Sequence, residues 1–436
     1  MIISIPVGFR ALPLPVAQLS LAAVLQCGQS FRWSVFPLPY PDFSVNPDAP
    51  RHEYRVCLRD RVVCLRQTPD TLFYRAVYPS PSLDPKEEAN KDAETLSWIR
   101  DYFQLDVDLL DLYSQWSKLD PVFHKLKDRF EGIRVLRQDP FECLLSFICS
   151  SNNNITRITK MVRALCTQFS SPVISLPPPN AEPGTELEPY HPFPPPSALS
   201  APEVTATLRT LGFGYRAEFI QKTAKMLADN HNTSATSSAK MQEPAELWLT
   251  TLRQMSTSEA RNELLKFMGV GRKVADCVML MSLDKREVVP VDTHVHQIAT
   301  KHYGMSSSSK SKAVKTTMTP KLYDELSSKF VGIWGEYAGW AHCVLFTSDL
   351  KAFASYGLET SSPSPSAPPS MSTTPTISAA STPSASPAKR KRAASKINVV
   401  KTEVVATVAE VSEDGSLAER VKRRRQLRVV ATDPSK

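Results

Sequence analysis

Two residues that could do covalent chemistry lie close together in the middle of the chain. Lys273 follows the tripeptide Gly269-Val270-Gly271, and Asp292 follows Val289-Pro290-Val291. A cation in the first turn of a helix lies at the unfavourable end of the helix dipole, which favours the uncharged amine. An uncharged lysine is a nucleophile that forms Schiff bases at suitable carbon centres. A nearby carboxylate would stabilise positive charge formed in such a reaction.

The residues around Lys273 predict two helices joined by a tight turn. An apolar stripe runs along residues 259–267, and Val274, Cys277, Val278 and Met281 recur at helical spacing over Arg272–Ser282. The two glycines permit a turn that β-carbons would obstruct. Free backbone N–H groups at the start of the second helix suit a phosphate oxygen.

The spacing alone supports a second interpretation equally well. Asp292 could serve only as the N-cap of a following helix. Lys273 could serve only as a positive charge that contacts phosphate.

Composition limits the class of protein. The chain has 436 residues, enough for two packed domains and an unstructured segment. Its eight cysteines are scattered without a C-x-x-C pair, which favours a reduced intracellular protein over a disulfide scaffold or a metal ribbon. No run of about 20 apolar residues predicts a membrane span. The first 15 residues have neither a long apolar core nor a small-residue cleavage site, so we do not expect a secretory signal.

The positive charge is concentrated near the C-terminus. Residues 389–436 hold 13 Lys/Arg and 6 Asp/Glu, a net charge of +7 out of +8 for the whole chain. Global charge therefore indicates a basic tail rather than a basic enzyme surface.

Hydrophobic periodicity divides the chain into three parts. Residues 1–118 predict a β-rich domain with strands at 31–36, 54–58 and 61–67 and a helix at 18–25. Residues 119–357 predict a helical domain, and 358–436 a disordered Ser/Pro-rich and basic tail. Polar insertions are expected at about 170–202, 230–242 and 305–319, the first as a surface loop too polar to bury.

Several motifs together resemble one family. F-M-G-V-G-R-K-V-A-D-C and V-P-V-D-T-H are similar to segments of the helix-hairpin-helix DNA glycosylases. C-G-Q-S-F-R-W, S-S-N-N-N-I-T-R and G-F-G-Y-R-A narrow the resemblance to 8-oxoguanine DNA glycosylases of the eukaryotic type. The matches extend from about Gly28 to Leu350. The resemblance implies an α+β fold: an N-terminal antiparallel β domain like the TATA-binding protein, then an all-α glycosylase domain.

The resemblance also implies a bifunctional glycosylase and lyase. Lys273 would attack the sugar C1′, Asp292 would stabilise the charge on the sugar, and the Schiff base would permit strand cleavage by β-elimination. The expected chemistry needs no metal or organic cofactor. Only Cys343 follows Asp292, so the four-cysteine iron–sulfur loop of some related glycosylases cannot form.

A base pocket is implied by the same resemblance. The main-chain carbonyl of Gly28 would accept from N7–H, a hydrogen that 8-oxoguanine has and guanine lacks. Phe346 would stack on the lesion opposite Cys277. The sequence departs from the family pattern at His342, where the family has a glutamine that contacts the base edge. From the residues alone, Gly28 could instead be a helix C′ cap, and Phe346 a core residue.

Contacts to duplex DNA follow from the resemblance in three places. Asn152 would fill the gap left by the extruded base, Arg157 and Arg216 would contact the orphaned cytosine, and Tyr215 would act as a wedge. Without the resemblance, Asn154 is predicted to cap the helix that follows it, and Tyr215 could be a core residue. The hairpin would grip phosphate with help from a bound cation and His294. These predicted contacts are Asn152, Arg157, Tyr215, Arg216, Gly269, Val270, Gly271 and His294.

Two other functions fit parts of the sequence. A sibling glycosylase for another oxidised or alkylated base would share Lys273 and Asp292 without depending on Gly28. A catalytically silent helix-hairpin-helix protein would bind DNA only. Borohydride trapping separates the three functions, because only a Schiff-base enzyme gives a covalent adduct. An adduct on an 8-oxoguanine:cytosine duplex that disappears in Lys273→Gln supports the first function. Trapping only on other lesions supports the sibling, and no adduct on any lesion supports the silent protein.

Partners and location are inferred from the tail and the composition. Two basic clusters, 389–392 and 422–425, predict recognition by nuclear import machinery and some sequence-independent phosphate binding. We therefore expect a monomeric nuclear protein that binds damaged double-stranded DNA and no membrane. A single arginine in the first 15 residues gives weak support for an additional mitochondrial fraction.

Overall fold

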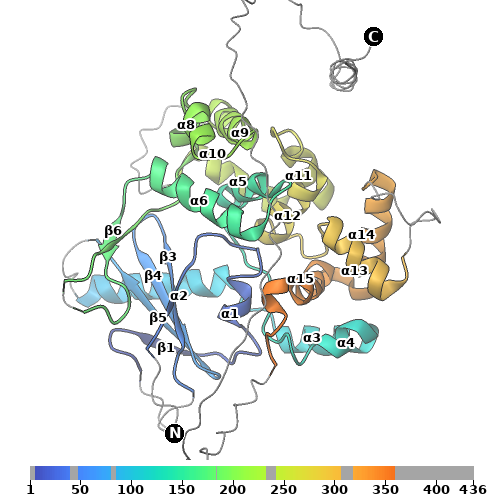
Figure 1. The fold of residues 1–436 in the computed structure, drawn as a ribbon, viewed down its shortest axis with the longest axis horizontal. Helices are drawn as coiled ribbons and strands as arrows, with labels where there is room; N and C mark the ends of the chain where they lie inside the picture. Colours follow the sequence, from blue (N-terminus) through green and yellow to red (C-terminus); the bar gives the residue numbers. More distant parts are fainter. Residues whose placement is uncertain are drawn as a thin grey trace, which may run out of the picture. The chain divides into compact units, whose positions relative to one another are not determined.

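The computed structural model describes residues 5–39, 48–79, 85–182, 184–231, 242–305 and 318–358 (Figure 1). All of them belong to one compact unit, residues 1–362. The predicted disordered tail from 359 onward, both basic clusters and most of the predicted insertions at 230–242 and 305–319 lie outside the described residues.

The N-terminal part contains a five-stranded antiparallel sheet with the order β1-β5-β4-β3-β2. The predicted hairpin is confirmed, since Glu53 pairs with Arg66 and Cys57 pairs with Val62 across the turn. Two strands that the sequence did not predict, β1 and β5, complete the sheet. The strands are β1 (Arg10–Pro13), β2 (Ser34–Pro37), β3 (His52–Cys57), β4 (Val62–Gln67) and β5 (Thr71–Val77). The expected antiparallel β domain is therefore confirmed.

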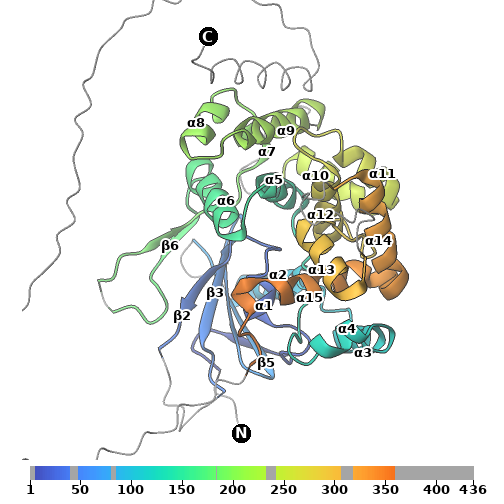
Figure 2. The ribbon, with the colours of Figure 1, turned by 45° about the vertical axis from the view of Figure 1, so that its right-hand side comes forward.

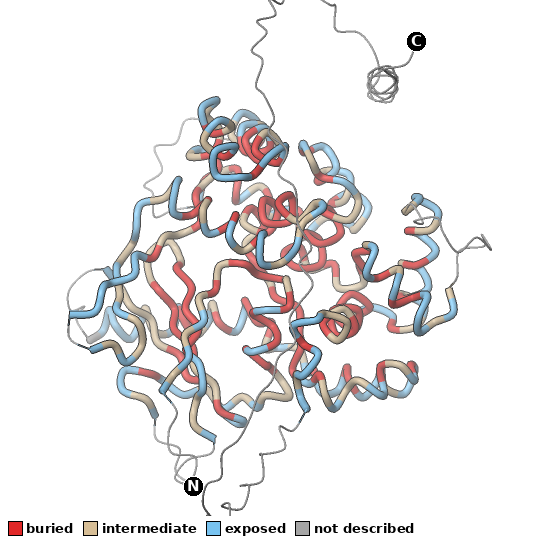
Figure 3. The backbone as a smooth tube through the Cα atoms, in the orientation of Figure 1, coloured by how far each residue is buried: buried red, intermediate tan, exposed pale blue. Residues whose placement is uncertain are grey.

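The central strand β4 is buried on both faces of the sheet, whereas the edge strands β1 and β2 are largely exposed (Figure 3). Val63 and Leu65 of β4 share one apolar cluster with Ile99 of α2 (Pro85–Tyr102). Cys64, on the opposite face of the same strand, belongs to a second cluster with Tyr190. A strand buried on both sides is apolar throughout instead of alternating.

The prediction of a polar surface loop at 170–202 is confirmed only in part. The described residues from 170 to 189 are exposed or half-buried, but Tyr190, Phe193 and Leu199 are buried. This segment forms a two-stranded antiparallel hairpin, β6 (Ile174–Leu176) and β7 (Glu188–Tyr190), followed by α7 (Pro196–Leu199). Tyr190 is buried, and its hydroxyl accepts from Arg55 Nη1 at 3.3 Å. The segment is rich in proline, but it also contains Ile174, Leu176 and Tyr190. These side chains pack on the face of the sheet that α2 does not cover.

The C-terminal part of the unit is helical, as predicted, and side-chain caps set many of the boundaries. Asp108, Asp120 and Asp139 each accept from N–H groups of the helix that follows. The N-terminal part also contains α1 (Leu21–Val24). The helices that follow α2 are α3 (Leu109–Leu119), α4 (Pro121–Leu126), α5 (Pro140–Ser150), α6 (Ile155–Phe169), α8 (Val204–Thr210), α9 (Arg216–His231), α10 (Pro244–Thr251), α11 (Thr257–Leu264), α12 (Arg272–Ser282), α13 (Thr293–Tyr303), α14 (Pro320–Trp334) and α15 (Ala338–Asp349).

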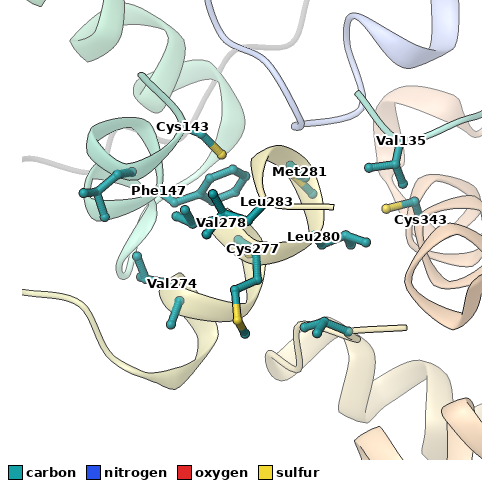
Figure 4. Close-up of a cluster of buried hydrophobic side chains, with 14 of the residues drawn as sticks. Val135, Cys143, Phe147, Val274, Cys277, Val278, Leu280, Met281, Leu283 and Cys343 are labelled. Carbon is teal, nitrogen blue, oxygen red and sulfur yellow. The ribbon is translucent and has the colours of Figure 1, made fainter. Parts of the chain in front are cut away.

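The centre of the helical part is the contact between α5 and α12. Nearly every residue of α5 is buried, in agreement with its all-round apolar sequence. Figure 4 shows Cys143 and Phe147 of α5 directed toward Val278 of α12. Helices α13 and α15 lie side by side in two views (Figure 1, Figure 2). Helices α12 and α15 carry four of the six residues predicted for catalysis and the base pocket: Lys273, Cys277, His342 and Phe346.

The cysteines agree with the predicted absence of a disulfide framework. All eight, each within the described residues, are buried free thiols. Among the described residues, no helix combines the length and apolar character that a membrane span requires.

We expect Gly132→Ala to destabilise the fold strongly. Gly132 has φ +72°, and a β-carbon there would lie 2.0 Å from Val16 O and 2.7 Å from Ser20 N. The free energy of unfolding should fall by about 3 kcal/mol or more, measured by chemical denaturation. Gly304→Ala is the matched control, because Gly304 has φ +66° and no neighbour within 4 Å. It should lose only about 1 kcal/mol, and equal losses in both variants would contradict this account.

Candidate active site

The predicted turn between α11 and α12 is present, and Gly269 is the glycine that it requires. Gly269 has φ +80°, and a β-carbon would lie 2.3 Å from Cδ2 of Phe219 on α9. Thr223, also on α9, donates to Met268 O at 3.2 Å. Helix α9 therefore packs directly beneath the hairpin and fixes its position.

Gly271 has a different role from the one expected. The turn does not need a glycine there, because φ is −94° and a β-carbon would meet nothing within 4 Å. Gly271 is exposed and is the N-cap of α12, where it supplies no side-chain hydrogen bond. The N–H groups of the first turn are therefore left without a side-chain cap, beside open space that an anion could enter.

Lys273 and Asp292 line the same cavity. It has a volume of about 60 Å³ and receives side chains from α5, α12, α15 and the loop after α1. Every residue predicted for the base pocket is present in its lining. The lining residues are Cys27, Gly28, Gln29, Phe147, Lys273, Cys277, Met281, Pro290, Asp292, His342, Cys343, Phe346 and Thr347.

Asp292 caps a helix and also lines the cavity. Its Oδ1 accepts from the N–H groups of His294 at 2.9 Å and Val295 at 3.1 Å, at the start of α13. Both capping bonds use one carboxylate oxygen, so Oδ2 is not needed for the cap. Asp292 can therefore serve both as the N-cap of α13 and as a carboxylate that stabilises positive charge in the cavity.

The amine of Lys273 contacts α5. Nζ lies 3.5 Å from Ser150 Oγ and 5.4 Å from the centre of the Phe147 ring. The sequence analysis did not assign a role to Phe147 or Ser150. Because α5 is apolar nearly all round, its sequence did not show which face meets the lysine.

Burial controls the ionisation of two other pocket residues. It raises the pKa of the Cys277 thiol to about 11, although the charge of Lys273 opposes the shift. It also lowers the pKa of His342 to about 4, so the imidazole is neutral at physiological pH. Neither ring nitrogen of His342 has a hydrogen-bond partner among the described residues, and the side chain is only 6% exposed. Buried polar atoms without partners are rare, and here they lie at the cavity wall.

Gly28 and Phe346, both predicted for the base pocket, line the same cavity. Gly28 has φ +90°, and a β-carbon would lie 2.9 Å from Ile155 Cδ1. Since α1 ends at Val24, Gly28 is not its C′ cap. Phe346 is half-buried, and its ring centre lies 6.1 Å from that of His342 and 6.0 Å from that of His294.

Gln29, which the sequence analysis did not single out, anchors this loop. The Gln29 side chain donates to Arg134 O and accepts from Leu136 N, both at 3.0 Å. The main-chain carbonyl of Gln29 accepts from the side-chain amide of Gln138. The three bonds attach the loop that contains Gly28 to the chain segment leading into α5.

Four of the eight residues predicted to contact DNA form a second cluster near the starts of α6 and α9: Asn152, Arg157, Tyr215 and Arg216. Asn152 is exposed with φ +48°, and Asn154 caps α6, as predicted, by accepting from Arg157 N at 3.0 Å. Arg157 donates to Gly212 O at 3.0 Å. Tyr215 is 49% exposed and donates to Ser151 O at 3.1 Å. The two loops are therefore joined to each other by hydrogen bonds.

Arg216, for which the resemblance implies a contact to the orphaned cytosine, is buried beside Tyr215. Arg216 is 3% exposed, and its guanidinium donates to Ser151 O and Asn152 O. Its guanidinium carbon also lies 4.5 Å from the centre of the Tyr215 ring. Backbone carbonyls satisfy the guanidinium, and that explains its burial.

The fold and the pocket define a class of protein. A helical domain that carries a glycine hairpin, a lysine directly after it and an aspartate in the same cavity is the arrangement of a base-excision DNA repair enzyme. Residues 145–321 match the family model described as HhH-GPD superfamily base excision DNA repair protein. Residues 11–144 match that of the 8-oxoguanine DNA glycosylase N-terminal domain.

Curated relatives place the chain within one family. It is 34% identical to the N-glycosylase/DNA lyase of Saccharomyces cerevisiae, over 78% of this chain and 86% of the yeast protein. It is 37% identical to N-glycosylase/DNA lyase OGG1 of Arabidopsis thaliana, over 78% of this chain and 80% of that protein. The chain belongs to the 8-oxoguanine DNA glycosylase family of bifunctional glycosylase/lyases.

A solved structure agrees with this assignment. The 8-oxoguanine glycosylase/lyase of Clostridium acetobutylicum, in complex with double-stranded DNA containing cytosine opposite 8-oxoguanine, superposes with a TM-score of 0.54 at 26% identity. The match covers 76% of this chain and 91% of the bacterial one.

Stability should depend on the protonation of His342. The unfolded state binds more protons than the folded state between the ordinary histidine pKa, about 6.5, and the folded value of about 4. Stability is therefore lost as pH falls through this window. Relative to His342→Gln, which has no titratable ring, the native protein should lose about 2 kcal/mol of unfolding free energy between pH 7 and pH 4.5. Urea denaturation measures this difference, and parallel pH dependences would contradict it.

Proposed function

We propose that the chain excises 8-oxoguanine paired with cytosine from duplex DNA and then cleaves the strand at the resulting abasic site. The observation that carries this proposal is the single cavity lined by Lys273, Asp292 and the Gly28 loop. At this cavity Lys273 would provide the nucleophile and Asp292 the stabilising charge. The main chain of Gly28, which lines the same cavity, would recognise the base.

The chemistry proceeds through the Lys273 amine. Its nitrogen lone pair forms a bond to the sugar C1′, and the glycosidic bond breaks with its electron pair on the departing base. Asp292 stabilises the positive charge that develops on the sugar. Opening of the sugar ring gives a Schiff base, and loss of a C2′ proton then expels the 3′ phosphate.

Base recognition combines a rigid backbone group with the pocket walls. Gly28 belongs to the loop that Gln29 anchors, so a carbonyl at this position would be held firmly toward the N7–H of 8-oxoguanine. Phe346 supplies an aromatic face at the cavity and Cys277 lies on another wall. The neutral ring of His342 offers one donor and one acceptor to a base edge.

The duplex is held by the loops joined through Arg157 and Tyr215. Tyr215 is exposed enough to enter the stack, and Asn152 is exposed in a left-handed backbone conformation. Arg157 and Arg216 would contact the cytosine, and each would have to exchange a backbone carbonyl for an acceptor on the base. The uncapped N–H groups at Gly271 would bind phosphate, assisted by His294 and a cation held by the hairpin.

Nuclear location and a monomeric state extend the same proposal. The two basic clusters of the tail, 389–392 and 422–425, support recognition by import machinery, and a mitochondrial fraction rests on the N-terminus alone.

A sibling glycosylase is the second candidate, and His342 favours it. An imidazole presents a different hydrogen-bonding pattern from the glutamine of the family, which puts the range of lesions in question. A silent DNA-binding protein is disfavoured, since such a protein would not need Lys273 and Asp292 at one cavity.

Lys273→Gln should abolish the covalent adduct. Borohydride trapping on an 8-oxoguanine:cytosine duplex should give an adduct with the native protein and none with this variant, because glutamine cannot form a Schiff base. Lys321→Gln, at an exposed position on α14, is the control and should trap normally. An adduct that persists in Lys273→Gln would exclude Lys273 as the nucleophile.

Asp292→Asn should separate the two roles of the aspartate. Asparagine also caps helices, so the free energy of unfolding should change little, whereas single-turnover base excision should slow by roughly a hundredfold or more. Asp292→Ala should lose a further ~1 kcal/mol of stability along with the rate. Normal excision by Asp292→Asn would show that the carboxylate acts only as a cap.

His342→Gln should change the choice of lesion. We expect the ratio of excision rates between 8-oxoguanine and oxidised purines with other Watson–Crick edges to shift about tenfold, since one hydrogen bond is exchanged for another. Single-turnover rates on a panel of lesion duplexes measure the ratio. His124→Gln on α4, outside the cavity, is the control, and unchanged ratios in His342→Gln would contradict contact with the base edge.

A further inference from the structure

The amine of Lys273 is held from one side by the last turn of α5. Ser150 Oγ lies 3.5 Å from Nζ, and the Phe147 ring lies one helical turn earlier on the same face. Hydrogen bonds at catalytic groups are often long before substrate binds and shorten in the complex. The contact at Ser150 is therefore of the kind that orients a reacting group.

The direction of the hydrogen bond is fixed by the second partner of Ser150. Its hydroxyl hydrogen is donated to Phe147 O at 2.7 Å. What remains toward Lys273 is oxygen lone pairs, so Ser150 can only accept from the amine. An uncharged amine that donates one N–H to a fixed acceptor has fewer directions left for its own lone pair. The Phe147 ring lies on another side of the amine and limits its movement in that direction.

We propose that Ser150 is a positioning residue that orients the Lys273 amine, so that its lone pair is directed into the cavity toward the sugar carbon. The inference rests on the proposed role of Lys273 as the nucleophile. Proper orientation of a nucleophile contributes much of the rate of enzymatic reactions.

The position of Ser150 gives this role a second consequence. The next residue is Ser151, whose carbonyl accepts from Tyr215 and Arg216, and Asn152 follows. The hydroxyl that orients the amine is therefore adjacent in the chain to the loop proposed to enter the duplex. A shift of that loop on DNA binding would reach Lys273 through a single peptide unit.

Ser348 provides a matched control. Its hydroxyl donates to Leu345 O at 2.7 Å, the same bond across three residues that Ser150 makes to Phe147 O. Ser348 lies in the last turn of α15 and does not line the cavity. If Ser150 only satisfied a carbonyl at the end of a helix, Ser150→Ala and Ser348→Ala would behave alike.

The test measures single-turnover excision and duplex affinity separately in the full chain. Ser150→Ala should slow excision and borohydride trapping of 8-oxoguanine:cytosine duplex about tenfold, with Kd changed less than about twofold. Ser150→Cys, whose sulfur is a weak acceptor of similar size, should be slowed similarly, and Ser150→Thr should recover to within about threefold of the native rate. Ser348→Ala should match the native protein.

A native excision rate in Ser150→Ala or in folded Ser150→Cys would overturn the inference. So would a loss in Ser150→Thr equal to that in Ser150→Ala. Lys273→Gln serves as the reference for the proposed function. If it still forms the adduct, Lys273 is not the nucleophile, and the role of Ser150 fails with it. If it does not while Ser150→Ala is as fast as the native protein, only the role of Ser150 fails.

Discussion

The structure depends on holding one lysine amine, half-buried, against the α5–α12 contact while an aspartate occupies the same cavity. Burial of an amine is unfavourable unless polar partners and a compensating charge are near. Ser150 and the Phe147 ring contact the amine from α5, and Asp292 supplies negative charge from the start of α13. Side chains from α5 and from the start of α13 therefore determine the position of the Lys273 nitrogen.

The other parts of the fold bring the substrate to that atom. The β domain contributes the Gly28 loop, which the side chain of Gln29 attaches to the segment before α5. Helix α9 supports Gly269 through Phe219, and the Phe219 ring also lies 5.5 Å from that of Tyr215. The hairpin proposed to bind phosphate and Tyr215, the proposed wedge, therefore both pack against α9. The distance between them is set by this helix before DNA binds.

Local chemistry was predictable from the sequence, but long-range contacts were not. The hairpin, the lysine after it and the capping roles of Asp292 and Asn154 follow from residue types at short spacing, and each is present. The burial of Arg216 depends on carbonyls 64 and 65 residues away, which no local pattern reveals. The hairpin at 174–190 is stabilised by an apolar sheet face elsewhere in the chain, so its own proline-rich composition misled the prediction.

The most direct test of the central claim is to identify the residue that becomes attached to DNA. The native protein would be reduced with borohydride during reaction with an 8-oxoguanine:cytosine duplex, and the digested adduct would be sequenced by mass spectrometry. The account predicts that the sugar remnant is carried by the peptide containing Lys273, on its side-chain nitrogen. A remnant on the N-terminal amine or on another lysine would contradict it.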